Sequence, residues 1–134
     1  MLCSSCKDAN TSKENTVMNT TDNVLLQEWK GPYQGLPAFD KMNVSDIKEA
    51  VETGMVLGLE DIAAITNNTE SPTFDNTIVP LEASADKLNH VFTYYGIMSS
   101  NMSSPEFRDI QGELAPKLSD YRSKISQNKK LFQR

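Results

Sequence analysis

Apolar residues return every three or four positions over most of the chain after residue 45, which is the spacing of helices with one buried face. The first such segment begins at Ser45, a residue that favours the N-cap, and ends at Asn67 and Asn68. Its apolar face consists of Ile47, Val51, Gly54 or Met55, Gly58, Ile62 and Ile65. Gly54 and Gly58 each weaken a helix by about 1 kcal/mol relative to Ala. Their presence on this face therefore predicts close contact with a second helix.

A second helix is predicted to start after Pro72, with Thr73 as its N-cap, and to run to Ser99. Its apolar positions follow steps of four and three: Phe74, Ile78, Leu81, Ala85, Leu88, Phe92, Tyr95 and then Met98 or Met102. Pro80 has no backbone N–H and crowds the preceding turn, so a kink is expected near residues 76–80. Tyr94 falls off this face, and we expect it to contact solvent, another domain or a substrate channel.

The third predicted helix begins at Ser104, with Pro105 in the first helical position, where its missing N–H removes no hydrogen bond. Its apolar face consists of Phe107, Ile110, Leu114, Leu118, Tyr121 and Ile125. Pro116 predicts a second kink, and residues 128–134 resemble the first turn of a further helix. Because no segment alternates like a strand, the predicted class is all-α, with long kinked helices in an antiparallel array.

Two segments of different composition precede the helices. Residues 7–23 are mostly polar or charged and bury too little apolar surface to offset the entropy lost on ordering, so 1–23 is expected to be a disordered tail. The next segment, 25–40, mixes bulky side chains with turn-forming residues. These are Trp29, Tyr33, Leu36 and Phe39, with Gly31, Pro32, Gly35 and Pro37 between them. We expect an extended aromatic arm that lies on the core of a helical part, 24–134.

The charge balance excludes one class of partner. The 134 residues include 18 acidic and 13 basic side chains, which give a net charge of -5. This is the opposite of the basic surface expected of a nucleic-acid-binding protein. No apolar run approaches the roughly 18 residues that a membrane-spanning helix needs. Neither nucleic acid nor a transmembrane segment is therefore expected.

Both cysteines, Cys3 and Cys6, lie at the start of the chain, so the helical part is expected to fold without disulfides. Their spacing would suit a redox pair or half of a zinc site. The run 2–8 also resembles the end of a bacterial lipoprotein signal with an acylated Cys6 and a polar tether, although Cys3 stands where that pattern has an aliphatic residue. An unstructured terminus is the alternative, and location stays open between cytoplasm and periplasm.

No catalytic constellation is recognisable in the sequence. A zinc peptidase typically needs two histidines four apart on a helix with a glutamate between them. The single histidine, His90, is followed by Val91 and Phe92, and we expect it at the surface or on the flank of its helix. Phosphate-binding glycine loops and the G-x-S-x-G nucleophile motif are missing. No catalytic, cofactor-binding or metal-binding residue is therefore predicted in this chain.

Several strings, in order along the chain, resemble the opening of the zinc oligopeptidases, the family of oligopeptidase A, peptidyl-dipeptidase Dcp and thimet oligopeptidase. They are Asn23-Val24-Leu25-Leu26 with Trp29, Pro32-Tyr33, Pro37-Ala38-Phe39-Asp40, Pro72-Thr73-Phe74-Asp75-Asn76-Thr77-Ile78 with Leu81-Glu82, Asn101, Ala115-Pro116-Lys117-Leu118, and Asn128 with Leu131-Phe132 and Arg134. Asp75 stands where the family has Glu. The resemblance extends from about Asn23 to the last residue, which favours a truncated or partial chain.

The resemblance implies the N-terminal helical part of a zinc metallopeptidase, a two-lobed helical enzyme whose deep channel admits short peptides. Release of dipeptides from carboxyl ends is the type expected first. The family's zinc ligands lie far downstream on an H-E-x-x-H helix that no position here matches. Zinc is thus expected in the intact enzyme, with the remaining catalytic part and short peptides as partners, and this chain alone is not expected to cut peptides. The alternative is a standalone, non-catalytic helical module that binds a peptide or protein, tethered through Cys6.

Overall fold

The computed structural model describes residues 23–31 and 35–134. The cysteines, the rest of the predicted tail up to residue 22 and the arm residues 32–34 lie outside the described residues, so the predictions made for them stay untested. All regular elements in the described part are helical. In chain order they are η1 (Val24–Leu26), α1 (Asp46–Asn67), the π-helix η2 (Phe74–Ile78), α2 (Val79–Ala83), α3 (Asp86–Asn101), α4 (Pro105–Ser126) and α5 (Lys129–Gln133). The predicted all-α class is confirmed.

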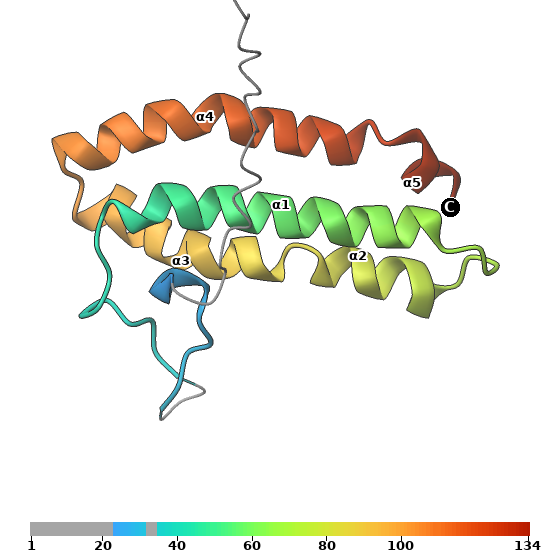
Figure 1. The fold of residues 1–134 in the computed structure, drawn as a ribbon, viewed down its shortest axis with the longest axis horizontal. Helices are drawn as coiled ribbons and strands as arrows, with labels where there is room; N and C mark the ends of the chain where they lie inside the picture. Colours follow the sequence, from blue (N-terminus) through green and yellow to red (C-terminus); the bar gives the residue numbers. More distant parts are fainter. Residues whose placement is uncertain (1–22, 32–34) are drawn as a thin grey trace, which may run out of the picture.

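Helix α1 is the centre of the fold, with α4 on one side and α2 and α3 on the other (Figure 1). The chain reverses between α1 and α3 and again between α3 and α4, so consecutive long helices run antiparallel. The turn η1 packs against both α1 and α3, and α5 returns to the end of α1. The buried core is made of Leu25, Leu26, Ile47, Ala50, Val51, Met55, Leu88, Val91, Tyr94, Met98, Phe107, Ile110, Leu114, Leu118 and Tyr121.

The start of α1 differs from the prediction. Ser45 immediately precedes the helix but makes no capping hydrogen bond, because its own backbone is already helical (φ -58°, ψ -29°). The Asp46 carboxylate instead accepts a hydrogen bond from the backbone N–H of Asn43 at 3.0 Å. Asn23, predicted to end the tail, caps η1, and its side-chain amide donates to the Asp46 carbonyl at 3.0 Å. This bond ties the start of the described chain to α1.

The glycines of α1 lie where its neighbours come closest, as predicted. A Cβ atom on Gly54 would lie 3.2 Å from the Cα atom of Leu88 in α3. A Cβ on Gly58 would lie 2.5 Å from the hydroxyl of Tyr121 in α4 and 3.0 Å from the carbonyl oxygen of Ser84. All three separations are shorter than ordinary van der Waals contact, so hydrogen is the only side chain that fits without displacing a neighbour.

The predicted second helix is interrupted twice. In η2 the N–H of Val79 donates to the carbonyl of Phe74, one residue further back than in an α-helix, and the chain turns again at residues 84–85 before α3. The first interruption coincides with the kink predicted at Pro80, which has no N–H to donate. Each interruption rotates the following residues about the helix axis. The apolar face extrapolated from Thr73 is therefore kept only in part in α3, where Leu88 and Met98 are buried as predicted.

The buried face of α3 consists of Leu88, Val91, Tyr94 and Met98. Phe92 and Tyr95, predicted for this face, are only partly buried and pack at the edge of the core. The error is larger at the start of the segment, where Phe74 and Ile78 were also predicted to be buried. Their side chains are 68% and 42% exposed. The prediction was therefore wrong for Phe74 and Ile78, whereas Phe92 and Tyr95 still contact the core.

Helix α4 matches its prediction. Ser104 accepts a hydrogen bond from the N–H of Phe107 at 3.1 Å, and the helix continues through Pro116 while arching away from α1 (Figure 1). Pro116 lies on the exposed side, consistent with a bend that is convex toward solvent. All predicted apolar positions except the partly buried Ile125 belong to the buried face.

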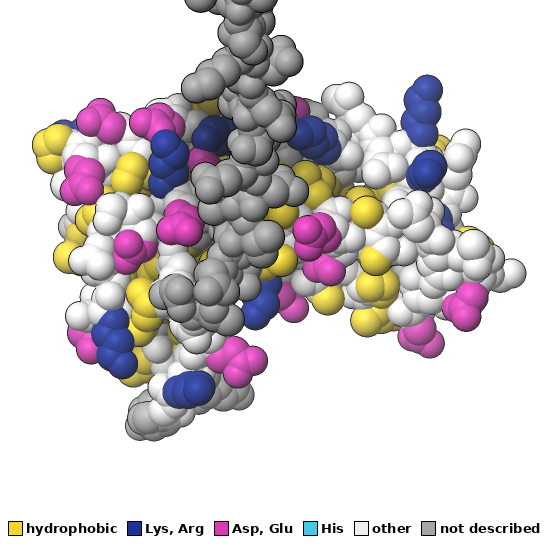
Figure 2. All heavy atoms as spheres, in the orientation of Figure 1, with side chains coloured by type: hydrophobic (Ala, Val, Ile, Leu, Met, Phe, Trp, Pro, Cys, Tyr) yellow, Lys and Arg dark blue, Asp and Glu magenta, His cyan; other side chains and the backbone are white. Residues whose placement is uncertain are grey.

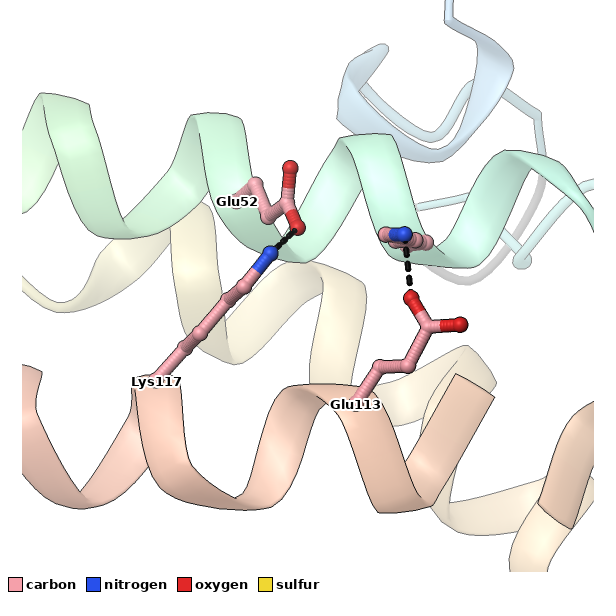
Figure 3. A network of polar contacts seen from close by, with 4 residues as sticks. Glu52, Glu113 and Lys117 are labelled. Atoms are coloured by element: carbon pink, nitrogen blue, oxygen red, sulfur yellow. Dashed lines mark hydrogen bonds and ion pairs between the residues drawn. The ribbon is translucent and has the colours of Figure 1, made fainter. Parts of the chain in front are cut away.

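Two ion pairs connect α1 with α4 (Figure 3). Lys48 pairs with Glu113, and Glu52 pairs with Lys117. Both pairs advance by four residues in the same direction, so α1 and α4 run parallel. The charged groups of both pairs are at least partly solvated, so the pairs add little to the stability of the fold. They specify the register of two helices that the apolar core already holds together.

Candidate functional site

Within residues 23–31 and 35–134, no group of three or more His, Cys, Asp or Glu side chains is placed to hold a metal ion. None of the helices in that part of the chain is long and apolar enough to cross a membrane. Two other features of the described surface bring together residues from distant parts of the sequence. One is the end of the molecule formed by η2 and α5, and the other is the crossing of the aromatic arm over α3.

Helix η2 and the two residues before it are formed by the string Pro72-Thr73-Phe74-Asp75-Asn76-Thr77-Ile78. The hydroxyl of Thr73 accepts a hydrogen bond from the backbone N–H of Asn76 at 3.1 Å, and the side-chain oxygen of Asn76 accepts the Thr73 N–H at 2.8 Å. This reciprocal pair is a capping box and confirms Thr73 as an N-cap. The Asn76 amide also donates to the carbonyl of Ser71 at 3.0 Å. The motif thus fixes the loop before η2 as well as the helix start.

Arg134, the last residue, connects this capping box to two other elements. One guanidinium nitrogen donates to the carbonyl of Asn68 at 2.7 Å and to that of Glu70 at 3.3 Å, and the other donates to the Asn76 side-chain oxygen at 3.2 Å. A cation here is favourable because the C-terminal end of α1 carries partial negative charge. Asn128 caps α5 by accepting the N–H groups of Lys130 and Leu131. Together these contacts hold α5 against η2.

The result is an apolar hollow of about 500 Å³ between η2 and α5. It is lined by Pro72, Thr73, Phe74, Thr77, Ile78, Leu81, Leu131, Phe132 and Arg134. We call Phe74, Ile78 and Phe132 the end cluster. Phe132 is 93% exposed, and the other two are 68% and 42% exposed. A group of large apolar side chains with such high exposure is typical of a surface that contacts another protein segment.

A second hollow of about 360 Å³ lies on the other side of Asn76, between α1 and α2. Its lining includes Asp61, Ile65 and Pro80. On the face in Figure 2, apolar side chains (yellow) reach the surface in the right half of the molecule, where Figure 1 places α1 and α2. Acidic and basic side chains are scattered around them. The end of the molecule therefore presents apolar surface on both sides of the Asn76–Arg134 contact.

Tyr94 anchors the aromatic arm, whereas the prediction placed it in contact with solvent, another domain or a substrate channel. Its side chain is fully buried, and its hydroxyl accepts hydrogen bonds from the indole N–H of Trp29 at 3.0 Å and from the backbone N–H of Ala38 at 2.9 Å. The ring of Phe39 packs edge-on against it, with centroids 5.2 Å apart. Trp29 and Phe39 thus lie on the helical core, as predicted, whereas Leu36 remains 64% exposed.

Gly35 permits the sharp return of the arm. Its backbone has φ +90°, a region that favours glycine. A Cβ at this position would lie 2.4 Å from the backbone carbon of Trp29. Glycine is therefore required both by conformation and by space, and the close approach lets Ala38 reach the same hydroxyl as Trp29.

His90 lies on the flank of α3, as predicted, but the arm covers it. Its ring centroid is 4.1 Å from that of Trp29, with the two rings inclined by 33°. The Nε2 atom is inaccessible to solvent, and the described residues offer it no hydrogen-bond partner. This burial lowers the pKa of His90 from its usual value, and the positive charge of Lys87 adds to the effect. The backbone of Gln27 and the charge of Glu28 act in the opposite direction.

Comparison with known proteins shows what the chain is similar to. No protein-family model matches it. It is 30% identical over 115 residues to the dipeptidyl carboxypeptidase of Escherichia coli strain K12, which covers 86% of this chain and 17% of that protein. The dipeptidyl carboxypeptidase of Salmonella typhimurium is 29% identical over 112 residues, covering 84% and 16%. The oligopeptidase A of Haemophilus influenzae is 29% identical over 99 residues, covering 74% and 14%.

These similarities confirm the resemblance to the N-terminal part of the zinc oligopeptidases. The chain spans 14–17% of the length of these curated relatives. The aligned part includes most of the helical segment described above.

Proposed function

We propose that this chain forms the N-terminal helical part of a zinc metallopeptidase that hydrolyses short peptides. The observation that carries the proposal is the similarity over 86% of the chain to a dipeptidyl carboxypeptidase of which it matches only 17%. Two of the three relatives are named dipeptidyl carboxypeptidases, so release of dipeptides from peptide carboxyl ends is the specificity we put first. The tail 1–23 and the helical part 24–134 are proposed as separate regions.

The described residues do not fit the zinc ion of such an enzyme. A peptidase zinc site requires three protein ligands and an open position for water or substrate. The single histidine of the chain, His90, has its ring stacked on Trp29. Among the described residues, no group of three or more His, Cys, Asp or Glu side chains is placed to hold a metal ion. We therefore assign the zinc ligands and the general base to a part of the parent protein outside this segment, and no catalytic step to the residues described.

The proposed role of the segment is to build part of one wall of the peptide channel. Helices α1, α3 and α4 share one core and would give that wall its stiffness. The remaining catalytic part is the proposed partner, and the end cluster is where we place it. Phe74 and Phe132 line the same hollow and are among the most exposed large apolar side chains described. Burying aromatic side chains of this size contributes strongly to an interface.

A standalone module that binds a peptide without cutting it is the second candidate. The hollow beside the end cluster, about 500 Å³, has the size and the largely apolar lining of a ligand site. Under this alternative, the hollow would hold an apolar peptide side chain. Tethering through Cys6 belongs to this alternative as well and lies outside the described residues.

Peptidase assays separate the two candidates. The purified 134-residue chain is expected to leave amino-terminally blocked oligopeptides intact, because its described residues supply no zinc site. The native gene product, captured with an antibody against residues 45–134, is expected to release dipeptides from their carboxyl ends. A chelator should stop this release and added zinc should restore it. Chelator-sensitive hydrolysis by the purified chain would contradict the assignment of the zinc site. Peptide capture without hydrolysis by the native product would favour the binding module.

A further inference from the structure

The single tryptophan and the single histidine of the chain meet where the arm crosses α3. Trp29 belongs to the arm and lies over His90 with ring centroids 4.1 Å apart. The same indole donates its N–H to the buried hydroxyl of Tyr94, one turn further along α3. The backbone of Gln27 hydrogen-bonds the imidazole from the arm side. The arm is thus attached to α3 through two neighbouring side chains, His90 and Tyr94.

The position of Nε2 makes this attachment sensitive to protonation. The atom is enclosed, and no described residue accepts a hydrogen bond from it. A neutral imidazole can leave one nitrogen without a partner at a modest cost in free energy. A proton on Nε2 would instead enclose a donor that carries positive charge, and burying an unpaired charge costs considerably more. Movement of Trp29 away from the imidazole would expose Nε2 to water and remove that cost.

The charged groups around the imidazole do not offset this cost. Lys87, one turn earlier on α3, disfavours a second positive charge, whereas Glu28 on the arm favours it. Burial has the largest effect and Lys87 acts with it. Attraction of an imidazolium to the indole face is weaker than the cost of enclosing an unpaired charge.

We propose that His90 is an acid-sensitive latch: its protonation releases the aromatic arm from α3 while the helices stay folded. Release remains local because the arm and the helices are held by different contacts. The buried faces of α1, α3 and α4 pack on one another, whereas the arm beyond η1 depends on Trp29, Ala38 and Phe39 at α3. This inference is independent of the proposed peptidase function.

The direction of the pH effect follows from the lowered pKa of His90. The unfolded or released histidine has a pKa near 6.5, and the covered one has a lower pKa. The released form therefore binds more protons just below pH 6.5, so attachment of the arm is complete above that pH and weakens as the pH falls below it. At pH values below both pKa values, the destabilisation of the attached arm by protonation reaches its full size.

One titration of the 134-residue chain reports on both partners, since each occurs once. The His90 ring protons are followed by NMR, Trp29 by its fluorescence, and helix content by circular dichroism. We expect a His90 midpoint below 6.5 and a shift of Trp29 emission to longer wavelength with the same midpoint, at constant helix content. In His90→Phe, which keeps a ring under Trp29, the emission should not change with pH. In Lys87→Gln the midpoint should move to higher pH.

Three outcomes would overturn the latch. They are a His90 midpoint at or above 6.5, a pH-dependent emission shift that persists in His90→Phe, and a loss of helix content that accompanies the shift. If His90→Phe does not fold, the NMR midpoint and the circular dichroism of the unmodified chain still decide the question.

Discussion

Replacing Phe107 by Ala is expected to lower the free energy of unfolding by about 3–5 kcal/mol. Phe107 is fully buried at the start of α4, and its ring packs edge-on against Tyr95 of α3 with centroids 5.2 Å apart. It therefore connects α3 and α4, which both also pack against α1. A loss of this size is a large fraction of the roughly 5–15 kcal/mol that stabilises a typical domain. Urea unfolding followed by circular dichroism measures it.

The same substitution at Phe132 is the matched control. Its side chain is 93% exposed, so Phe132→Ala should change the free energy of unfolding by no more than about 0.5 kcal/mol. The contrast tests the distinction between a phenylalanine of the core and one on the surface. Equal losses in the two variants would mean that Phe132 is buried in the isolated chain, and the end cluster would no longer be available for docking.

Gly58→Ala is expected to destabilise the chain by about 1–3 kcal/mol through overpacking, even though alanine favours a helix by about 1 kcal/mol over glycine. The new methyl group would lie 2.5 Å from the Tyr121 hydroxyl and 3.0 Å from the Ser84 carbonyl oxygen. The hydroxyl can move with its side chain, but the carbonyl belongs to the turn between α2 and α3. Thermal or urea unfolding of the variant gives the change in stability.

Gly96→Ala tests the opposite case within the same fold. Gly96 lies in the interior of α3, and a Cβ built on it meets no described atom within 4 Å outside its own helix backbone. Here helix propensity acts alone, so the variant should gain about 1 kcal/mol. If Gly58→Ala is stabilising to the same extent, α1 does not approach its neighbours as closely as described.

Helices α1 and α4 could be predicted from the sequence because their apolar period runs without interruption between recognisable ends. Asn67 and Asn68 end α1, and Ser104 with Pro105 begins α4. The two close-packed glycines were also predictable, since glycine on the apolar face of a helix has little purpose other than close contact. These features depend on local sequence, where periodicity and capping preferences act directly.

The face of α3 could not be predicted in the same way. One additional residue in a helical turn rotates everything after it by about 100°. Pro80 indicated that the segment would be disturbed but not by how much, and nothing in the sequence marked the turn at residues 84–85. Prediction therefore chose Phe92 and Tyr95 where the fold buries Val91 and Tyr94.

Tyr94 and the end cluster illustrate a different limit. The donors to the Tyr94 hydroxyl are 56 and 65 residues away in sequence and belong to an arm without periodicity. For Phe74 and Ile78, apolar character was taken to mean burial within this chain. Both side chains are exposed, and a periodic pattern cannot distinguish an apolar residue buried in the core from one on the surface. The Asn76–Arg134 contact likewise depends on residues 58 positions apart.

The intact mass of the native gene product tests the central proposal most directly. An antibody against residues 45–134 would capture it, and mass spectrometry would compare it with the 14.9 kDa of this chain. We expect a mass several times larger, with peptides whose sequence includes an H-E-x-x-H zinc motif beyond the part described here. A product with the mass of this chain alone would contradict the proposal and leave the helical binding module as the better account.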